Sequence, residues 1–383
     1  MKNIINYSKH FVDKKDVFEV NKVLKSDFLT QGPKVKKFED KIKQYLGVKY
    51  SIAVNSATSG LHLSCLALGV KKNDIVWTTP NSFVATANCV IHCGGKIDFI
   101  DINPNTYNIC TELLEKKLKK TKKKNLPKVI IIVHFSGLPC DLSKIKRLST
   151  KYKFKIIEDS SHALGANYKD TKIGDCKFSD ISVFSFHPIK SITSGEGGMV
   201  TTNSKEISNN LSILRSHGIL KNRTLFEKKY RIETHYDQVS LGFNFRMNDI
   251  EAALGISQLK KLKKFIRRRK EIANFYFKNL NKLPIKLPIN SKDSSWHLFV
   301  ILLKDFNIRN KFYKYLKKRG IVCQLHYIPI HTHTYYKKKK FKSNYCPNSV
   351  EYYKTCISLP MFYSLKNKHL EKIVSSIKKF YAN

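Results

Sequence analysis

The sequence predicts an α/β protein with a mostly parallel β-sheet covered by helices on both faces, followed by a smaller α/β domain. The first observation is that short apolar segments alternate with segments of helical periodicity from about residue 50 onward. Such alternation favours parallel strands, because each helix serves as the crossover between two of them. The second observation is the length of 383 residues, which exceeds what a single hydrophobic core usually holds.

The expected elements follow one another in order along the chain. A strand at 51–54 precedes a helix at 57–68 that begins with small residues. Further apolar segments, each typical of a buried strand, lie at 74–79, 96–101, 129–134, 154–159, 180–186 and 199–202. The helices expected between them are at 83–93, 113–120 and 142–152. The sequence contains no internal repeat.

The C-terminal part is expected to form the smaller domain. A helical pattern with few breakers runs over 248–280, and the segments 296–303 and 321–327 are expected to belong to a smaller α/β domain. We therefore divide the chain into a large cofactor-binding domain, 1–255, and a linker helix with the small domain, 256–383. The N-terminal segment is a candidate to pack on the small domain.

The most informative segment is 183–200, in which an apolar strand delivers Ser185 and then Lys190 to its end. A glycine-rich loop and a second apolar strand follow. A partly desolvated lysine can lose its proton and form a Schiff base with an aldehyde cofactor. The apolar neighbours expected to desolvate it are Phe184, Phe186 and Pro188. An exposed loop lysine is the competing interpretation, because the chain holds 71 Lys and Arg residues.

Asp159 supplies the chemistry that favours the first interpretation. It ends the apolar strand at 155–159, and ligands of open α/β sheets bind outside the carboxyl ends of strands. Asp159 and Lys190 are therefore expected to face one crevice. A carboxylate there can hold a pyridine nitrogen protonated, which with a Schiff-base lysine is what proteins contribute to pyridoxal phosphate (PLP) chemistry. Taken alone, Asp159 is equally typical of a helix N-cap.

The segment 55–60 predicts an anion site. Small hydroxyl residues there follow a strand and precede an apolar helix, so free N–H groups at the helix N-terminus would suit a cofactor phosphate. The signal is weak by itself, because serine and threonine cap many helices.

The net charge of +42 raises the question of nucleic acid. Basic runs at 116–124, 260–270 and 337–340 match no nucleic-acid-binding module, and we expect no specific nucleic-acid partner. Solvated helix faces and loops are the favoured interpretation. Non-specific binding of polyanions at low salt is still expected, and positive potential would also favour an anionic substrate such as a nucleotide sugar.

Cysteine and histidine spacing indicates no metal site. The nine cysteines are irregularly spaced; Cys89 and Cys93 lack a second pair, and His331 and His333 lack further ligands nearby. Free thiols fit a reducing cytoplasm. No run approaches the roughly 18 apolar residues of a membrane span, and residues 1–10 lack the features of a signal peptide. We therefore expect a cytoplasmic protein without a membrane partner.

These motifs together resemble the sugar-nucleotide aminotransferases of the DegT/DnrJ/EryC1/StrS family, which are fold type I PLP enzymes, over essentially the whole chain. The segments that carry the resemblance are 29–32, 56–58, 80–86, 158–159, 185–190, 195–198, 215–218, 242–247 and 326–329. Within the family, Tyr7 and the segments 65–70, 76–78 and 136–141 look most like the branch of pseudaminic acid biosynthesis. That branch aminates C4 of a UDP-linked 4-keto-6-deoxy N-acetylhexosamine, with L-glutamate as the expected amino donor.

The resemblance implies a role for each matching residue. Lys190 would be the Schiff-base lysine and the acid/base, and Asp159 would pair with the pyridine nitrogen. The other cofactor-binding residues it implies are Ala57, Thr58, Phe83, His162, Ser185 and Asn244. Asn244 would reach across from the neighbouring subunit of a homodimer, and His162 stands where many relatives carry glutamine. The substrate-facing residues it implies are Tyr7, Asp27, Phe28, Leu29, Thr30, Ala57, Ser185, Asn244, Gln324, Leu325, His326 and Tyr327.

Several alternatives stay open at this point. Without the family context, Phe83 and Tyr327 fit ordinary core packing, Asn244 fits a turn, and Tyr7 fits a surface aromatic. Other branches of the family share the cofactor motifs and aminate C3 or C4 of UDP- or dTDP-linked sugars. The dehydratase branch replaces the lysine by histidine, so Lys190 argues against it. A regulatory or polyanion-binding homologue would have no need of that lysine.

Overall fold

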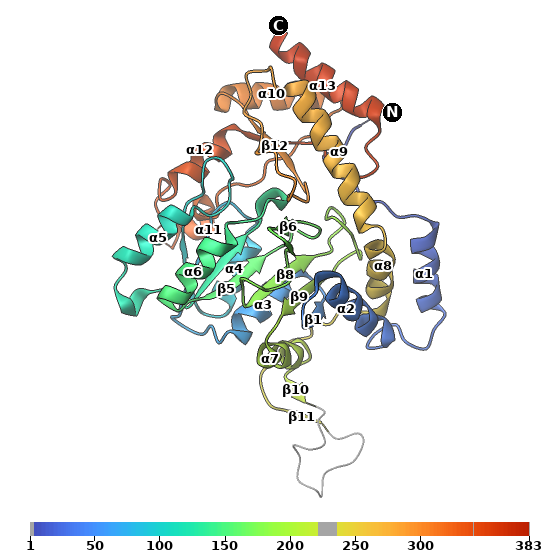
Figure 1. The fold of residues 1–383 in the computed structure, drawn as a ribbon, viewed down its shortest axis with the longest axis vertical. Coiled ribbons are helices and arrows are strands. Elements are labelled where there is room, and N and C mark those ends of the chain that lie inside the picture. The colour runs from blue at the N-terminus through green and yellow to red at the C-terminus, as the bar shows by residue number, and fades with distance from the viewer. Residues whose placement is uncertain (1–3, 221–235, 340, 383) are drawn as a thin grey trace, which may run out of the picture.

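The computed structural model describes residues 4–220, 236–339 and 341–382, and a seven-stranded sheet forms its centre (Figure 1). In spatial order the strands are β1 (Tyr50–Val54), β9 (Gly198–Thr202), β8 (Ile181–Ser185), β5 (Lys155–Asp159), β4 (Val129–Val133), β2 (Ile75–Thr78) and β3 (Lys96–Phe99). All pairs from β8 to β3 are parallel, and only β9 runs antiparallel to its neighbours. The predicted mostly parallel sheet is confirmed.

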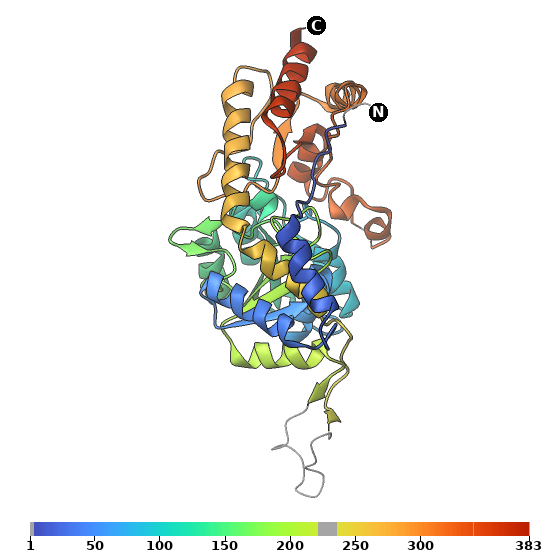
Figure 2. The same ribbon diagram turned by 90° about the vertical axis from the view of Figure 1, so that its right-hand side faces the viewer.

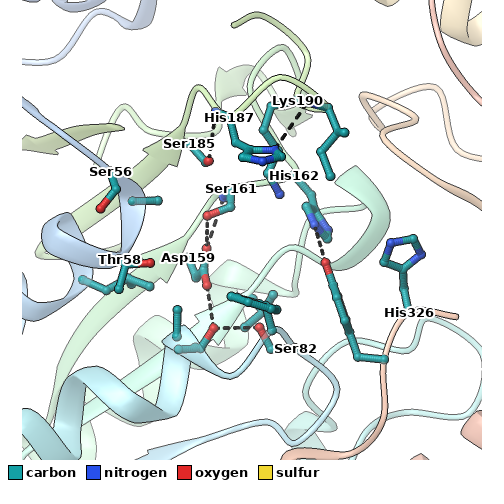
Figure 3. Close-up of a pocket in the computed structure, with 18 of the residues that line it drawn as sticks. Ser56, Thr58, Ser82, Asp159, Ser161, His162, Ser185, His187, Lys190 and His326 are labelled. Atoms are coloured by element: carbon teal, nitrogen blue, oxygen red, sulfur yellow. Dashed lines mark hydrogen bonds between the residues drawn. The ribbon is translucent and has the colours of Figure 1, made fainter. Parts of the chain in front are cut away.

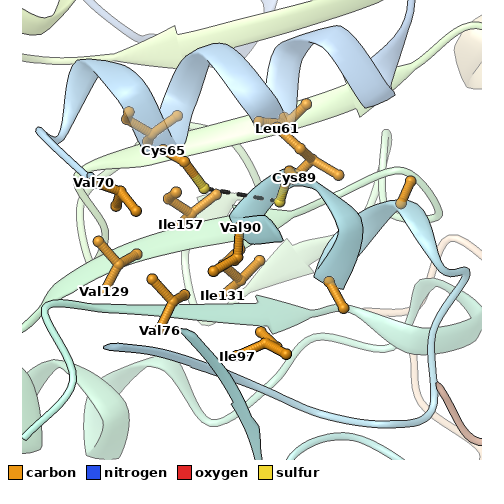
Figure 4. Close-up of a cluster of buried hydrophobic side chains, with 14 of the residues drawn as sticks. Leu61, Cys65, Val70, Val76, Cys89, Val90, Ile97, Val129, Ile131 and Ile157 are labelled. Carbon is orange, nitrogen blue, oxygen red and sulfur yellow. Dashed lines mark hydrogen bonds between the residues drawn. The ribbon is translucent and has the colours of Figure 1, made fainter. Parts of the chain in front are cut away.

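Helices cover both faces of this sheet. One face carries α3 (Ala57–Ala67), α4 (Ala85–His92) and α7 (Lys205–Arg215). The other carries α2 (Pro33–Leu46), α5 (Thr111–Lys120), α6 (Leu142–Tyr152) and α8 (Asp249–Leu259). Successive residues of β4 point to opposite faces of the sheet. Ile131 packs in the cluster under α3 and α4 shown in Figure 4, whereas Ile130 packs under α5 and α6.

Local signals explain where the covering helices begin. The side chains of Ser56, Asp141 and Ser204 cap α3, α6 and α7, each accepting from the N–H of the third helical residue. A capping box of Asn248 and Glu251 starts α8. The helix expected over 248–280 is therefore present as two helices, α8 and α9 (Leu262–Leu280), with a break at 260–261.

The C-terminal part builds a second cluster around a two-stranded antiparallel sheet of β12 (Phe299–Leu302) and β13 (Cys356–Leu359). Around it lie α9, α10 (Phe306–Lys318), α12 (Pro347–Thr355) and α13 (Asn367–Ala382), whereas α11 (Thr334–Lys337) packs on the large-sheet cluster through Tyr336. The segment 321–327 adds no strand to this sheet and forms only single bridges, Ile5 to Ile321 and Gln324 to Ser358.

The N-terminal segment joins this C-terminal cluster. Ile5 is buried in it, and the chain then descends to α1 (Lys14–Leu24) beside α8 (Figure 2). The division of the chain at residue 255 stays a prediction. The remaining elements are short: β6 (Asn167–Tyr168), β7 (Thr171–Lys172), β10 (Ile219–Leu220), β11 (Asp237–Gln238) and 3-10 turns at Lys123–Asn125, Phe135–Gly137 and Ile330–Thr332. Among the helices of these described ranges, none is both long and apolar enough to cross a membrane.

Candidate active site

A cavity of about 590 Å³ opens at the carboxyl ends of β5 and β8 (Figure 3). The residues expected from the sequence that line it are Tyr7, Ala57, Thr58, Phe83, Asp159, His162, Ser185, Lys190, Gln324, Leu325, His326 and Tyr327. The cavity lining does not include Asp27, Phe28, Leu29, Thr30 or Asn244. Residues 27–30 lie between α1 and α2, and Asn244 pairs with Ser216, so the roles of these five residues stay predictions.

Asp159 is held in one orientation by three donors. The Thr86 hydroxyl donates to its Oδ2 at 2.7 Å, and the Ser161 hydroxyl and N–H donate to its Oδ1 at 2.6 and 3.2 Å. Ser82 continues this chain to Thr86 at 2.7 Å, as Figure 3 shows. These bonds leave lone pairs of the carboxylate for a further partner in the cavity.

Lys190 follows β8 in a tight turn, in which its N–H donates to the carbonyl of His187 at 2.9 Å. Burial lowers the pKa of Lys190 to about 8, while Asp159 acts in the opposite direction. Roughly a quarter of such amines carry no proton at pH 7.5, which makes Lys190 a competent nucleophile. Lys190 is desolvated as expected, but Phe184 and Phe186 are not the cause, since they lie in the cluster with α2 and α8 and do not line the cavity.

The N-terminus of α3 forms one wall of the cavity. Ser56 Oγ accepts from Ser59 N at 3.1 Å, whereas the preceding N–H groups, of Ala57 and Thr58, have no acceptor within the helix. The hydroxyl of Ser185 lines the cavity beside them. Gly198 packs against this turn so closely that a Cβ there would lie 2.7 Å from Ala57 N. The geometry suits a phosphate group.

His162 has a defined tautomer. Its Nδ1 accepts from the N–H of Ser136 at 3.3 Å, so the neutral ring carries its hydrogen on Nε2. Nε2 lies 3.1 Å from the hydroxyl of Tyr327, which therefore accepts, and the tyrosine hydrogen is free to donate elsewhere. Burial, followed by the charge of Lys190, lowers the pKa of His162 well below its usual range. His162 is consequently a neutral donor in the cavity wall.

His326 is a second neutral imidazole in this wall. Its Nδ1 lies 2.8 Å from Ser358 Oγ, and its ring centroid lies 5.7 Å from that of Tyr7. Burial and then Lys190 lower the pKa of His326 to about 3. Phe83, in contrast, is 61% exposed and lines the cavity, which leaves an aromatic face for a planar ligand.

Sequence reasoning missed the residues that orient Asp159. Ser82 lies in the loop before α4 and Thr86 in the first turn of that helix, so no helical spacing joins the two hydroxyls, and no sequence signal points to their contact. Ser161 follows Asp159 by two residues, as in a common local turn. Over the described ranges no group of three His, Cys, Asp or Glu side chains is arranged to hold a metal ion, and all nine cysteines are free thiols.

Comparison with known proteins identifies the family to which the sequence motifs point. The profile of the DegT/DnrJ/EryC1/StrS aminotransferase family matches residues 11–378. A UDP-4-amino-4,6-dideoxy-N-acetyl-beta-L-altrosamine transaminase of Campylobacter jejuni serotype O:2 is 40% identical over 390 residues, which cover 99% of this chain and 100% of the relative.

Solved structures agree over the full length. Helicobacter pylori PseC, an aminotransferase involved in the biosynthesis of pseudaminic acid, superposes with a TM-score of 0.90 at 34% identity, covering 99% of this chain and 100% of that one. The PLP form of the sugar aminotransferase Spr1654 from Streptococcus pneumoniae gives a TM-score of 0.90 at 27% identity, covering 99% of both. The fold type I prediction is confirmed. The chain belongs to the DegT/DnrJ/EryC1/StrS aminotransferase family.

Proposed function

We propose that this aminotransferase uses PLP to transfer the amino group of L-glutamate to C4 of a UDP-linked 4-keto-6-deoxy N-acetylhexosamine, in pseudaminic acid biosynthesis. The observation that carries the chemistry is that Lys190 and Asp159 line one buried cavity together with the N-terminus of α3. The similarity to the Campylobacter transaminase supports the choice of sugar.

The residues present fit the cofactor. The N–H groups of Ala57 and Thr58, with Ser185, would hold the phosphate, and Asp159 would pair with the ring nitrogen. When bound, PLP would supply an electron sink and a carrier for the amino group. Phe83 would cover one face of the ring, and His162 would contact the ring hydroxyl through the Nε2–H that it otherwise donates to Tyr327.

Lys190 would act twice in this reaction. Its amine, with a pKa of about 8, is a nucleophile toward the cofactor aldehyde at neutral pH. After the amino donor has bound, the same Nζ would carry a proton between the Cα of glutamate and C4′ of the cofactor. A group that both accepts and returns a proton works best with a pKa near the working pH.

The sugar substrate would bind at the side of the cavity away from the N-terminus of α3. Tyr7 and the segment 324–327 line that side and present aromatic and imidazole groups rather than carboxylates. The other family branches, which act on C3 or C4 of UDP- or dTDP-linked sugars, are the alternative within the proposal. The non-enzyme alternative is a protein that binds polyanions through its charge. This alternative does not explain why Lys190 and Asp159 line one cavity.

A panel of UDP- and dTDP-linked keto sugars with L-glutamate tests the proposal, with products identified by mass and NMR. The expected result is a C4 amine on the UDP-linked 4-keto-6-deoxy N-acetylhexosamine. Amination of a dTDP-linked sugar, or amination at C3, would change the proposed substrate but would still support an aminotransferase. If the protein binds PLP but aminates no sugar and takes no amino group from glutamate, the enzyme proposal itself is overturned.

We further propose that the active enzyme is a homodimer with shared sites. Asn244 does not line the cavity of its own chain, and the resemblance places this segment at a neighbour's cofactor site. A two-fold interface would let one asparagine of each copy serve the other. Mixing Lys190→Ala and Asn244→Ala proteins should then restore activity, since one site of the mixed dimer carries neither change. No gain after confirmed subunit exchange would contradict the shared site.

A further inference from the structure

His297 lies behind the cavity, packed on the ring of His162. The two ring centroids are 4.3 Å apart and the planes differ by 33°. Both residues are almost fully buried, at 3% and 6% exposure, but only His162 lines the cavity. His297 therefore covers one face of a ring whose edge contacts the site.

The main chain of His297 is fixed on both sides. Its N–H donates to the carbonyl of Ser136 at 2.9 Å, and its carbonyl accepts from Arg269 at 3.1 Å. Arg269 is itself buried and also donates to the carbonyls of Trp296 and Met361. Ser136 thus joins the two residues, because its carbonyl accepts from the main chain of His297 and its N–H donates to Nδ1 of His162.

We propose that His297 is a positioning residue, which excludes water from the covered face of His162 and keeps the Nε2–H of that ring directed at Tyr327 and the cavity. Its importance for catalysis depends on the proposed function, in which His162 contacts the cofactor. The arrangement of the two rings does not depend on it.

The charged and titratable groups around His162 and His297 explain why shielding from water matters. Lys190 and His326 line the same cavity as His162, Tyr327 bonds to its Nε2, and Arg269 bonds to the carbonyl of His297. Burial, then these cations and imidazoles, lowers the pKa of both rings well below the usual range. A proton on Nδ1 of His162 would remove the acceptor of Ser136 N–H. Water at the uncovered face would allow that protonation at ordinary pH.

Two substitutions separate covering from mere packing. His297→Phe keeps an aromatic ring over His162, whereas His297→Ala opens the face to water. His369→Ala, on the distant helix α13, is the matched control for loss of one imidazole. Should the alanine variant fail to fold, His297→Asn, with a smaller and polar side chain, takes its place with the same expected outcomes.

The first readout is histidine NMR of the cofactor-free protein, with the His162 resonance identified by its loss in His162→Gln. It should titrate near pH 6.5 in His297→Ala and show no titration above pH 5 in the wild type, His297→Phe and His369→Ala. The second is the pH profile of kcat/KM with the accepted keto sugar. His297→Ala alone should lose about tenfold more activity than wild type between pH 7.5 and 5.5, as expected for a new pKa near 6.5.

The outcomes distinguish the two proposals. A His162 resonance that does not titrate in His297→Ala, or that titrates near 6.5 in the wild type, overturns the positioning role. Loss of thermal stability without a new titration means that His297 only packs. If the NMR result is as expected but no keto sugar is aminated, the proposed function fails and the role of His297 stands.

Discussion

Acidification should destabilise this protein in the range where its buried histidines would titrate if they were solvated. His162, His297 and His326 are each at most 6% exposed, and burial lowers the pKa of all three. The folded state keeps them neutral, while the unfolded chain takes up a proton on each near pH 6.5. Their folded pKa values are below the unfolded ones, so stability is complete above pH 6.5 and is lost as the pH falls below it.

The magnitude follows from the linkage relation. Between pH 7.5 and 5.0, a histidine that protonates only in the unfolded state costs about 2 kcal/mol, and three cost about 6 kcal/mol. A typical domain is stable by about 5–15 kcal/mol, so the loss approaches the whole free energy of unfolding. Lys190 adds only about 0.2 kcal/mol in the same direction, because its pKa changes from about 10.5 to about 8 and lies mostly above this window.

The assay is urea unfolding of the cofactor-free protein at fixed protein concentration across pH 5.0–7.5. His297→Phe should reduce the pH-dependent loss by about 2 kcal/mol, one histidine's share. Cys93, whose pKa is lowered to about 6 chiefly by its hydrogen bond with Cys65, adds a slope above pH 6, and Cys93→Ser isolates it. An unfolding free energy that stays constant from pH 7.5 to 5.0 would refute the assignment of neutral buried histidines.

The remaining predictions concern the cavity. Lys190→Ala should abolish turnover while the protein stays folded, as circular dichroism and product assays would show; appreciable residual transamination would contradict its role. Asp159→Asn should cost on the order of a thousandfold in kcat, because a neutral amide cannot hold a ring nitrogen protonated; near-normal turnover would reduce Asp159 to a cap. Gly198→Ala should weaken PLP binding measured by absorbance titration, because its Cβ would press on Ala57 N at 2.7 Å; unchanged affinity would argue against the phosphate site there.

The sequence predicted the sheet and the reacting pair for the same physical reason. Strands buried on both faces are continuous apolar runs, and Asp159 and Ser185 end two of them, β5 and β8, which pair in parallel. Their ends therefore meet at one edge of the sheet. Lys190 could be placed beside them from chain order alone.

Contacts between distant segments could not be predicted in this way. The bond between Tyr327 and His162 joins residues 165 positions apart, and neither lies in a periodic pattern that encodes it. The apolar segment 321–327 resembles a strand, but it forms only single bridges, while the four residues of β13 take the place beside β12. Phe184 and Phe186 pack away from the cavity, because strand alternation and the following turn direct them to the cluster under α2.

The turn at Ser136 and Gly137 limits how the enzyme can open. Five hydrogen bonds join the turn and the carbonyl of His162 to Ser295, His297 and Leu298, which lead into β12. At about 1 kcal/mol each, rotating the C-terminal region away from the sheet would cost several kcal/mol before any substrate contact is gained. These bonds fix the C-terminal region to the sheet, so the turn is not expected to act as a hinge. Substrate access should depend on side chains and loops at the cavity mouth, and small-angle scattering should give the same dimensions with and without the nucleotide sugar.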